Sequence, residues 1–537
     1  MTRQNVKSEG MAGLATTIPV ILPGAALAEN TSAASLGNKA FNLARMAALG
    51  LPVPPGFVIG TAWCARAEEV GPALWRPALE RLEEATGRRL GDPRRPLLLS
   101  VRSGAPVSMP GMMETLLNIG LSDATVDGML RLTGHPRLVW DAYRRLVAGF
   151  GEVVAGIDPA AFDADLDAIR GSVPERALDF DALRRLTRRH LDTYARTAGT
   201  AFPQDPADQL QAAIQAVFRS WQAPKARSWR ALHAIADSMG TAVTVQQMVF
   251  GNAGGLSGAG VGFTRDPTTG VPGLWVDFLF NAQGEDVVAG RRSAEGHEAL
   301  SAAAPHLWAE LVASAARLEQ TFGDMQDIEF TIENGRLFLL QTRDGKRTPL
   351  AAARIALDLL DEGLIDARTA RDRLRSLDRA SLAERVIATA DGTVAEPLAR
   401  AASASAGVAS GPIALDEAQV EAARARGETP ILVRRDAETR DVAALDRAAG
   451  LLTMRGARTS HAAVVARQLG KVCLVGCGEL TIDEAAGRVM IGGRIFGTGS
   501  RITLDGNTGA VHAGALEVVT REPQDLLTRM ATVLAPD

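Results

Sequence analysis

The chain has 537 residues, more than one hydrophobic core usually supports, so we expect about three domains. Its net charge of −4 is small, and Lys and Arg are interleaved with acids, which gives no indication of a nucleic-acid partner. Three scattered cysteines do not make a disulfide framework, so we expect a reducing, cytoplasmic compartment. The stretch MAGLATTIPVILPGAALA predicts a strand and a turn, and no run is long enough to span a bilayer.

The first half of the chain changes from mixed to helical to strand-like patterns. GNKAFNLARMAALGLPVPPGFVIG predicts a turn, a helix and a proline-rich loop into a strand, because Gly50 and the prolines stop the helix. Residues 121–235 carry apolar residues at three- and four-residue spacing, which is typical of helices. From residue 241, the runs TAVTVQQMVFG, GAGVGFTRD and GLWVDFLF predict strands.

The second half begins with a hairpin. DIEFTIENGRLFLLQTR places two alternating runs around Asn334-Gly335, a strong turn signal. Residues 350–378 again predict helices. Residues 385–411 are rich in Ala, Ser and Gly without clear periodicity, and we interpret them as a boundary and linker. Residues 412–515 predict a compact unit of strands and short helices.

Two basic residues are candidate phosphate ligands. Lys39 follows a Gly-Asn turn at the start of a helix, where the lysine and the backbone N–H groups could meet a phosphate. A solvated lysine on the first turn of a helix is the alternative. Arg102 ends a buried-looking strand before a Ser-Gly-rich turn, and its planar fork suits phosphate oxygens. The following SMPGMM suggests a loop that closes over a ligand, or else a hairpin with an adaptable Met cluster.

The hairpin carries a second candidate site. Asp327 and Glu329 share one face of the first strand, and Gln341 and Arg343 share a face of its partner. Two carboxylates could hold Mg²⁺, while the amide and the guanidinium could meet triphosphate oxygens. The alternative is a solvated polar face. The glycine-rich stretch 250–266 could lie over the phosphates of a nucleotide, although glycine loops alone are weak signals.

His461 differs from the other six histidines of the chain because it stands where a helix begins. Thr459 or Ser460 can cap that helix, which then runs toward Gly470. Helix N-termini favour negative charge, so the position suits a histidine that carries a phosphoryl group. A histidine that merely caps the helix is the alternative.

GLLTMRGARTSHAAVVARQLGKVCLVGCGEL closely resembles the phosphohistidine signature of the pyruvate, phosphate dikinase family. The segments GNKAFNLA, SVRSGAPVSMPGMMETLLNIGL, GTAVTVQQMVFGN, GVGFTRDPTTG, NAQGEDVVAG and DMQDIEFTIENGRLFLLQTRDGKRT resemble that family's nucleotide-binding segments, in the same order. The resemblance covers roughly residues 30–515. It implies an α/β multidomain fold: an ATP-grasp-like domain with a helical insertion, followed by a swivelling phosphohistidine α/β domain.

The resemblance also implies roles at matching positions. Lys39 and Arg102 would bind ATP phosphates, and Glu285 in NAQGEDVV matches an acid of the nucleotide site. His461 would be the nucleophile and phosphocarrier. Thr459 matches a threonine that some plant members use for regulatory phosphorylation, which needs a dedicated partner protein.

The hairpin residues receive roles in the same way. Asp327, Glu329 and Gln341 would serve Mg²⁺ and phosphate, and Arg343 would stabilise the transferring groups.

The implied domain boundaries follow the patterns above. They are residues 1–120 and 236–350 for the two ATP-grasp parts, 121–235 for the insertion, 351–411 for a helical segment and linker, 412–515 for the phosphohistidine domain, and 516–537 for a C-terminal tail. The family's C-terminal barrel, which binds phosphoenolpyruvate and pyruvate, has no counterpart before Asp537.

The resemblance therefore implies an ATP- and phosphate-dependent half-reaction that phosphorylates His461 and releases AMP and pyrophosphate. Pyruvate or a related acceptor would bind a separate chain; a homodimer is left open. One alternative is a phosphotransferase component with a different acceptor, as in phenylphosphate synthase. Another is a non-catalytic nucleotide-sensing regulator.

Overall fold

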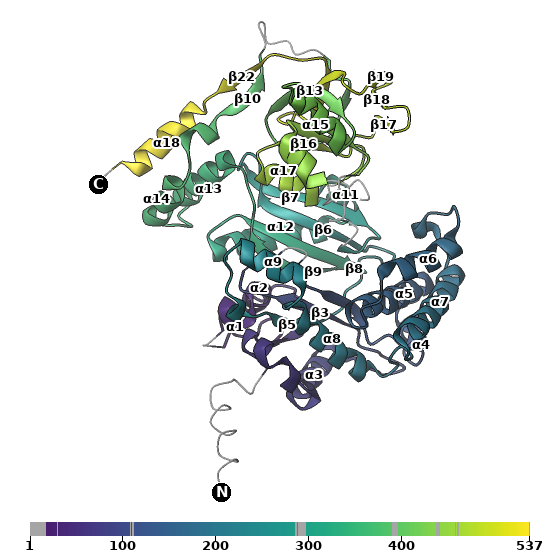
Figure 1. Cartoon of the computed structure of the whole chain (residues 1–537). Helices are drawn as coiled ribbons and strands as arrows, with labels where there is room; N and C mark the ends of the chain where they lie inside the picture. Colours follow the sequence, from purple (N-terminus) through teal and green to yellow (C-terminus); the bar gives the residue numbers. More distant parts are fainter. Residues whose placement is uncertain are drawn as a thin grey trace. The chain divides into compact units, whose positions relative to one another are not determined.

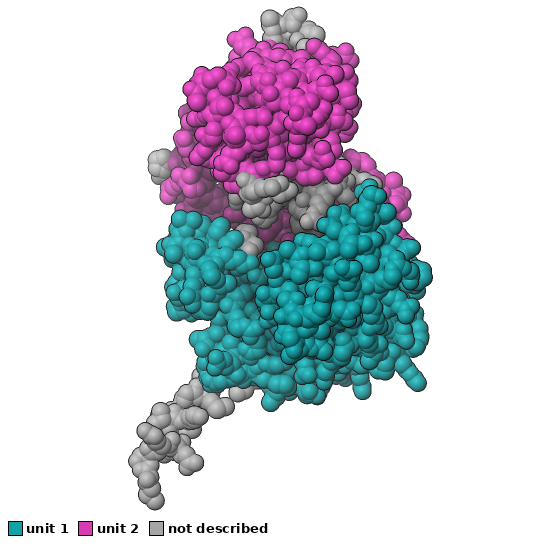
Figure 2. Space-filling model, turned by 45° about the vertical axis from the view of Figure 1, so that its right-hand side comes forward, with its two compact units in different colours: residues 1–254, 338–341 teal, residues 255–337, 342–537 magenta. Residues whose placement is uncertain are grey.

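The computed structural model describes residues 18–28, 31–107, 109, 112–284, 287, 297–388, 396–436, 441–456, 458 and 461–535. The chain forms two compact units, which Figure 2 distinguishes by colour. Unit 1 contains residues 1–254 and 338–341, and unit 2 contains residues 255–337 and 342–537. The mixture of sheets and helices confirms the predicted α/β fold class.

Unit 1 is built on a five-stranded sheet of order β1-β2-β5-β3-β4, in which the neighbouring strands are antiparallel. The strands are β1 Val20–Ile21, β2 Gly56–Ile59, β3 Leu99–Gly104, β4 Thr115–Ile119 and β5 Ala242–Gln247. Strand β5 follows the long helical region in sequence but lies between β2 and β3. The helical region is therefore an insertion into the chain path of this sheet.

The predicted helix after Gly37 and the predicted helical region 121–235 are confirmed, and unit 1 contains further helices. The α-helices in the described residues of unit 1 are α1 Ala33–Leu36, α2 Asn38–Ala48, α3 Pro72–Thr86, α4 Val126–Thr133, α5 Pro136–Val153, α6 Pro159–Arg170, α7 Phe180–Ala198, α8 Pro206–Ser220 and α9 Pro224–Leu232. Among the described residues, 3₁₀ helices also occur at η2 Thr61–Glu69, η3 Glu175–Ala177 and η4 Asp237–Met239. Helices α6, α7 and α8 begin after an aspartate whose carboxylate accepts a backbone N–H bond of the first turn. Helices α4 to α7 gather into one bundle (Figure 1).

Unit 2 contains a four-stranded sheet of order β7-β6-β8-β9. Its strands are β6 Gly258–Arg265, β7 Pro272–Phe280, β8 Gln326–Glu333 and β9 Arg336–Asp344, and helices α11 His297–Ala303 and α12 Pro305–Phe322 precede β8. The predicted hairpin is confirmed. Asn334 and Gly335 both have positive φ, 50° and 74°, as a tight two-residue hairpin turn requires.

The glycines of β6 have a packing role. A Cβ atom on Gly258 would lie 2.2 Å from the ring of Phe278, and one on Gly260 would lie 2.4 Å from the ring of Phe330. These two rings stack at 5.9 Å with an interplanar angle of 4°. Part of the glycine-rich stretch that we interpreted as a phosphate cover is therefore a buried strand, where missing side chains make room for aromatic rings.

The eight-stranded sheet of unit 2 has the order β11-β21-β20-β13-β14-β15-β16-β12. Its strands are β11 Ala399–Arg400, β12 Ala402–Ser405, β13 Val408–Ala414, β14 Ile431–Arg434, β15 Gly450–Thr453, β16 Val472–Val475, β20 Arg501–Asp505 and β21 Ala510–Ala513. Strands β13 to β16 are parallel, and helices α15 Glu417–Ala425, α16 Val442–Arg447 and α17 His461–Gln468 connect them. A separate three-stranded sheet contains β17 Leu480–Asp483, β18 Arg488–Ile491 and β19 Arg494–Gly497.

The prediction of an irregular linker over residues 385–411 is wrong for residues 399–411. They form β11, β12 and the start of β13 within the eight-stranded sheet. Small side chains conceal the strand pattern, since Ala404 and Ala409 are almost fully buried. Gly411 is needed for close packing, because a Cβ there would lie 2.2 Å from the carbonyl oxygen of Thr429.

The C-terminal residues form regular structure where we expected a tail. Strand β22 Val518–Arg521 pairs with β10 Glu384–Ile387, and helix α18 Gln524–Leu534 follows. Helix α18 packs with α13 Pro349–Asp361, α14 Ala367–Arg375 and the 3₁₀ helix η5 Arg379–Leu382 (Figure 1). Strand β10 precedes the eight-stranded sheet in the chain and β22 follows it, so the two strands that flank this sheet in sequence pair with each other.

Candidate active site

Lys39 lies in the first turn of α2, and α2 begins against the end of β3. A Cβ on Gly37, whose φ is 74°, would lie 1.9 Å from the carbonyl oxygen of Gly104. The backbone N–H of Asn38 donates to the carbonyl of Ala105 at 3.0 Å. Only glycine permits this approach, and the contact fixes the start of α2 at the end of the strand that carries Arg102.

Arg102 lies on the predicted strand β3, but the strand continues through Ser103 and Gly104, which we expected in a turn. The backbone of Arg102 is opposite Thr244 of β5 on one side and Thr115 of β4 on the other. Arg102 is half-buried and Lys39 is exposed. Because β3 is paired on both sides, the backbone position of Arg102 is fixed. The nearby start of α2 supplies backbone N–H donors, so this part of unit 1 is suited to bind an anion.

Asp327 and Arg343 are brought together across the hairpin of unit 2. The Nε of Arg343 donates to Oδ2 of Asp327 at 2.7 Å. Asp327 is 5% exposed, and burial raises the pKa of its carboxyl above the ordinary value, although Arg343 opposes this. Burial lowers the pKa of Arg343, but Asp327 and Glu329 outweigh that effect and raise it.

The hairpin fits a divalent cation by its donor set. Oδ1 of Asp327 is buried and has no hydrogen-bond partner among the residues that the structure describes. The half-buried Glu329 lies two residues along the same strand, and the buried Gln341 lies on β9. Carboxylate and amide oxygens are the ligands that Mg²⁺ prefers. No group of three or more His, Cys, Asp or Glu residues suited to a metal occurs within the described ranges.

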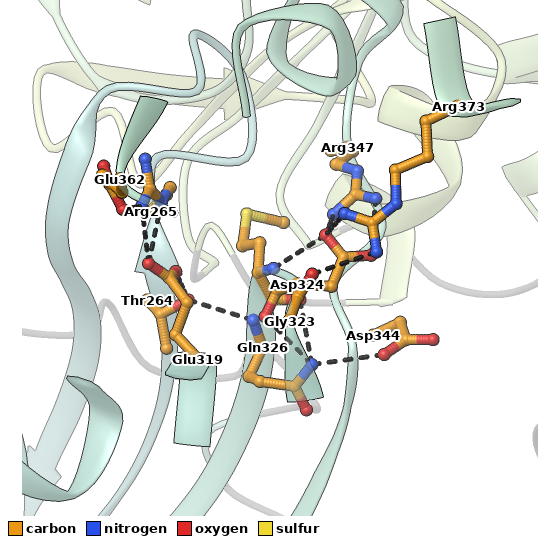
Figure 3. A network of polar contacts seen from close by, with 11 residues as sticks. Thr264, Arg265, Glu319, Gly323, Asp324, Gln326, Asp344, Arg347, Glu362 and Arg373 are labelled. Carbon is orange, nitrogen blue, oxygen red and sulfur yellow. Dashed lines mark hydrogen bonds and ion pairs between the residues drawn. The ribbon is translucent and has the colours of Figure 1, made fainter. Parts of the chain in front are cut away.

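A polar network holds the end of this hairpin (Figure 3). Gln326, next to Asp327, accepts a bond from Thr342 at 2.9 Å and donates to Asp344 at 3.2 Å. Arg347, four residues after Arg343, binds Asp324 through both Nη atoms, at 2.6 and 2.8 Å. These contacts fix the backbone on each side of the ion pair, which limits how far Asp327 and Arg343 can move.

A second arginine group lies in the same network. Arg265, at the end of β6, donates to Glu319 of α12 at 2.7 and 2.9 Å and to Glu362 at 2.6 Å. This buried group ties the helices to the sheet.

His461 is the first residue of α17, which follows the parallel strand β15. In sheets of this kind the carboxyl ends of strands and the following helix N-termini are the usual ligand sites. Helix α17 ends at Gln468, and Gly470 has a φ of 63°, in agreement with the predicted stop. The side chain of His461 lies outside the described residues.

Other predicted positions also lie outside the described residues. They are Glu285, Thr459, Ser460 and, in the SMPGMM loop, Ser108, Pro110 and Gly111.

Sequence reasoning missed Arg458, three residues before His461. Its Nε donates to Oδ1 of Asp277 at 3.0 Å, and its Nη2 donates to the carbonyl of Val276 at 3.2 Å. Its guanidinium carbon lies 3.9 Å from the ring centroid of Trp275. Arg458 and these β7 residues lie at least 181 positions apart in the sequence. The sequence therefore indicated no contact here beyond the presence of an arginine in a loop of small residues.

The candidate residues are divided between the units. Unit 1 contains Lys39, Arg102 and Gln341. Unit 2 contains Asp327, Glu329, Arg343 and His461. No helix in the part of the chain that the structure describes is both long and apolar enough to cross a membrane.

The fold and the site define a protein with a sheet-based domain that suits anionic ligands and an α/β domain with a histidine at a helix start. The family model of the pyruvate phosphate dikinase AMP/ATP-binding domain matches residues 71–298 and 294–363, and the model of the mobile domain of PEP-utilising enzymes matches residues 427–509. The chain belongs to the pyruvate, phosphate dikinase family, as the resemblance indicated.

Individual relatives agree with the family models. The chain is 42% identical over 496 residues to the pyruvate, phosphate dikinase of Clostridium symbiosum, which covers 90% of this chain and 56% of that protein. It is 43% identical over 489 residues to pyruvate, phosphate dikinase 2 of Zea mays, which covers 89% of this chain and 55% of that protein. The chain thus spans about half the length of the curated relatives it matches.

Proposed function

We propose that this chain catalyses the ATP half-reaction of a dikinase and carries the phosphoryl group on His461. The observation that supports this most is the start of α17 at His461, at the carboxyl end of the parallel strand β15, in a segment that matches the mobile domain of PEP-utilising enzymes. A helix N-terminus stabilises the negative charge that phosphorylation adds.

In the proposed first step, a nitrogen of the His461 imidazole attacks the β-phosphorus of ATP. The bond between the β-phosphorus and the oxygen that bridges to the α-phosphorus breaks, and AMP leaves. In the second step an oxygen of inorganic phosphate attacks the terminal phosphorus, and the bond from that phosphorus to the oxygen bridging to the β-phosphorus breaks. Pyrophosphate is released, and the β-phosphoryl group stays on His461. Mg²⁺, when bound, would neutralise charge on the phosphate oxygens.

The residues of this chain would act mainly by positioning and charge neutralisation. Lys39, Arg102 and the first turn of α2 would bind phosphate oxygens from unit 1. Arg343 would neutralise charge that develops during transfer, and Asp327, Glu329 and Gln341 would hold the cation. The same proposal assigns Glu285 to the nucleotide site. The pairing of Arg343 with a buried carboxylate supports this assignment, because it fixes the guanidinium in one direction.

We further propose that the phosphohistidine domain begins near Ala399 rather than at residue 412, since β11 and β12 belong to its sheet. The nucleotide domain would comprise the five-stranded sheet, the four-stranded sheet and the helical insertion. The phosphorylated domain would then move to an acceptor, pyruvate or a related compound, bound on a separate chain. Strands β10 and β22 run side by side where such a movement would pivot.

Radiolabelled ATP tests the proposal. With ATP, Mg²⁺ and phosphate, the full chain should form at most about one acid-labile phosphohistidine per chain from the β-position of ATP, with a burst of AMP and pyrophosphate. His461→Asn should lose all labelling and keep ATP binding. Formation of ADP instead of AMP would contradict the two-step route and indicate an ordinary kinase. Absence of nucleotide cleavage would favour the nucleotide-sensing regulator.

A further inference from the structure

Arg458 makes three kinds of contact with one strand of the four-stranded sheet. It forms an ion pair with Asp277, a hydrogen bond to the backbone carbonyl of Val276, and a cation–π contact with Trp275, all on β7. The side chain of Asp277 is 3% exposed and that of Arg458 is 21% exposed, so the ion pair is largely shielded from water. Such a combination orients a guanidinium in one direction, which a solvated ion pair does not do.

The two ends of this contact belong to different parts of unit 2. Asp277 and Trp275 lie in the sheet that carries Asp327, while Arg458 lies in the loop between β15 and α17. The contact therefore ties Arg458, three residues before His461, to the sheet that carries the candidate cation ligands.

A second arginine fixes Arg458 to its own domain. Arg467, on α17, donates from Nε and Nη2 to the carbonyl of Ala404 in β12 at 3.0 and 2.7 Å, and its Nη2 reaches the carbonyl of Arg458 at 3.4 Å. It is 3% exposed, and its guanidinium carbon lies 5.6 Å from the ring centroid of Phe263 in β6. Arg458 is thus held to α17 through its backbone carbonyl and to β7 through its side chain.

We propose that Arg458 is a positioning residue that docks the His461 loop on β7 during the ATP half-reaction. This inference rests on the proposed function. The docking contact is electrostatic at its centre, because one charged guanidinium meets one buried carboxylate. In the proposed function, the phosphohistidine domain must dissociate from the nucleotide domain after phosphorylation. One ion pair and one cation–π contact can orient a loop and are weak enough to be broken when the domain moves. Neither Arg458 nor Asp277 needs to touch the nucleotide.

The first test measures docking without using activity. Spin labels on E310C in α12 and E417C in α15, two exposed positions, report the separation of the two parts of unit 2 in a C64S background. The spin-labelled chain with Arg458 and Asp277 intact should give one narrow distribution of label-to-label distances. R458A should broaden or shift it. R455A, which removes an exposed arginine from the same loop, should leave it unchanged.

The second test measures the chemical step. R458A should slow single-turnover formation of phosphohistidine from β-labelled ATP by about tenfold or more, because the loop before His461 is then no longer held on β7; tenfold corresponds to about 1.4 kcal/mol. The dissociation constant for ATP should stay within about twofold, since the proposal gives Arg458 no contact with the nucleotide. R458K keeps the charge but loses the planar fork, and should be intermediate.

Charge reversal and salt distinguish docking from a merely structural role. R458D should be the slowest variant, and the double variant R458D/D277R should recover part of the rate. Raising the KCl concentration from about 50 mM to about 1 M should slow the parent chain and leave R458A nearly unchanged, because the screening length falls to about 3 Å.

Unchanged distance and rate in R458A, with R458D equally unaffected, would overturn the proposal. A slower rate with an unchanged distance population would also overturn it, because Arg458 would then act without docking. Variants that fail to fold are recognised by thermal unfolding, and R458K, the mildest change, then carries the test. If the parent chain forms no phosphohistidine, the proposed function fails, while the spin-label distances still decide whether Arg458 docks the loop.

Discussion

Arg343 and Asp327 form an ion pair across the β8–β9 hairpin, with Nε and Oδ2 2.7 Å apart. The side chain of Asp327 is 6% exposed and that of Arg343 is 43% exposed, so one partner is buried and the other reaches outward. A substitution of Arg343 would therefore leave a buried carboxylate without this partner, and it would also remove the group that we propose neutralises charge during transfer.

For this pair we expect Arg343→Ala to slow AMP formation by about 10²–10³-fold, the usual effect of removing one donor that stabilises developing charge. It should also lower the free energy of unfolding by about 1–3 kcal/mol, because the Asp327 carboxylate loses its pairing. Adding Asp327→Asn to Arg343→Ala should restore most of the stability but none of the rate. Chromatography of released AMP and urea denaturation check both expectations; unaltered AMP release by Arg343→Ala would remove this residue from the mechanism.

The close approach of Gly37 to Gly104 leads to a second prediction. Gly37→Ala places a Cβ 1.9 Å from a backbone oxygen at a φ of 74°, so α2 must shift away from β3. We expect a loss of about 3 kcal/mol or more in the free energy of unfolding, together with weaker ATP binding, because Lys39 moves with the helix. Calorimetric titration with ATP and urea denaturation measure the two effects.

Gly50→Ala is the matched control for that variant. Gly50 has a φ of 71°, yet no atom lies within 4 Å of a Cβ built there. It should therefore show only the cost of the left-handed conformation, about 1–2 kcal/mol, with unaltered ATP binding. Equal losses in the two variants would mean that the contact between α2 and β3 has no special role.

Cys473 gives a prediction for alkaline pH. Burial raises the pKa of this thiol from 9.0 to about 12. Between these values the unfolded chain releases the proton and the folded chain retains it, so the stability of the fold decreases as pH rises, by up to about 1.4 kcal/mol per pH unit from this group. Cys473→Ala should show a shallower decrease between about pH 9 and pH 11. Urea denaturation at several pH values measures the slope; identical slopes would contradict the raised pKa. Cys477 is present in both proteins, so its contribution cancels.

The last prediction concerns the acceptor. The purified chain should not form phosphoenolpyruvate appreciably from ATP, phosphate and pyruvate, because we assign no pyruvate site to it. Addition of a separate acceptor-binding barrel from the family should produce phosphoenolpyruvate, and His461→Asn should abolish this. Robust formation by the chain alone would show that the acceptor binds within the present residues.

Much of the local structure is determined by short-range physical chemistry and is therefore readable in the sequence. Asn334-Gly335 adopts positive φ at little cost, so the hairpin with Asp327 and Arg343 follows from the residues around it. Helices of the insertion begin at capping aspartates such as Asp158 and Asp179, and α17 begins at His461 as expected. The long motifs around Lys39, Arg102 and His461 are specific enough to indicate the family by themselves.

Other features depended on contacts between distant segments. Strand β5 pairs with β2 and β3, although a long helical region separates it from both in the sequence, and no local sequence pattern indicates which strands it pairs with. The alanine-rich strands of residues 399–411 have little hydrophobic alternation, since small side chains are buried through close packing. Arg458 pairs with Asp277, which is 181 residues away in the sequence, and a single charged residue in a loop does not indicate which residue it will pair with. The sequence by itself determined the elements and the residue types of the site. Only the tertiary structure decided which side chains face each other, because burial and pairing are properties of the assembled chain.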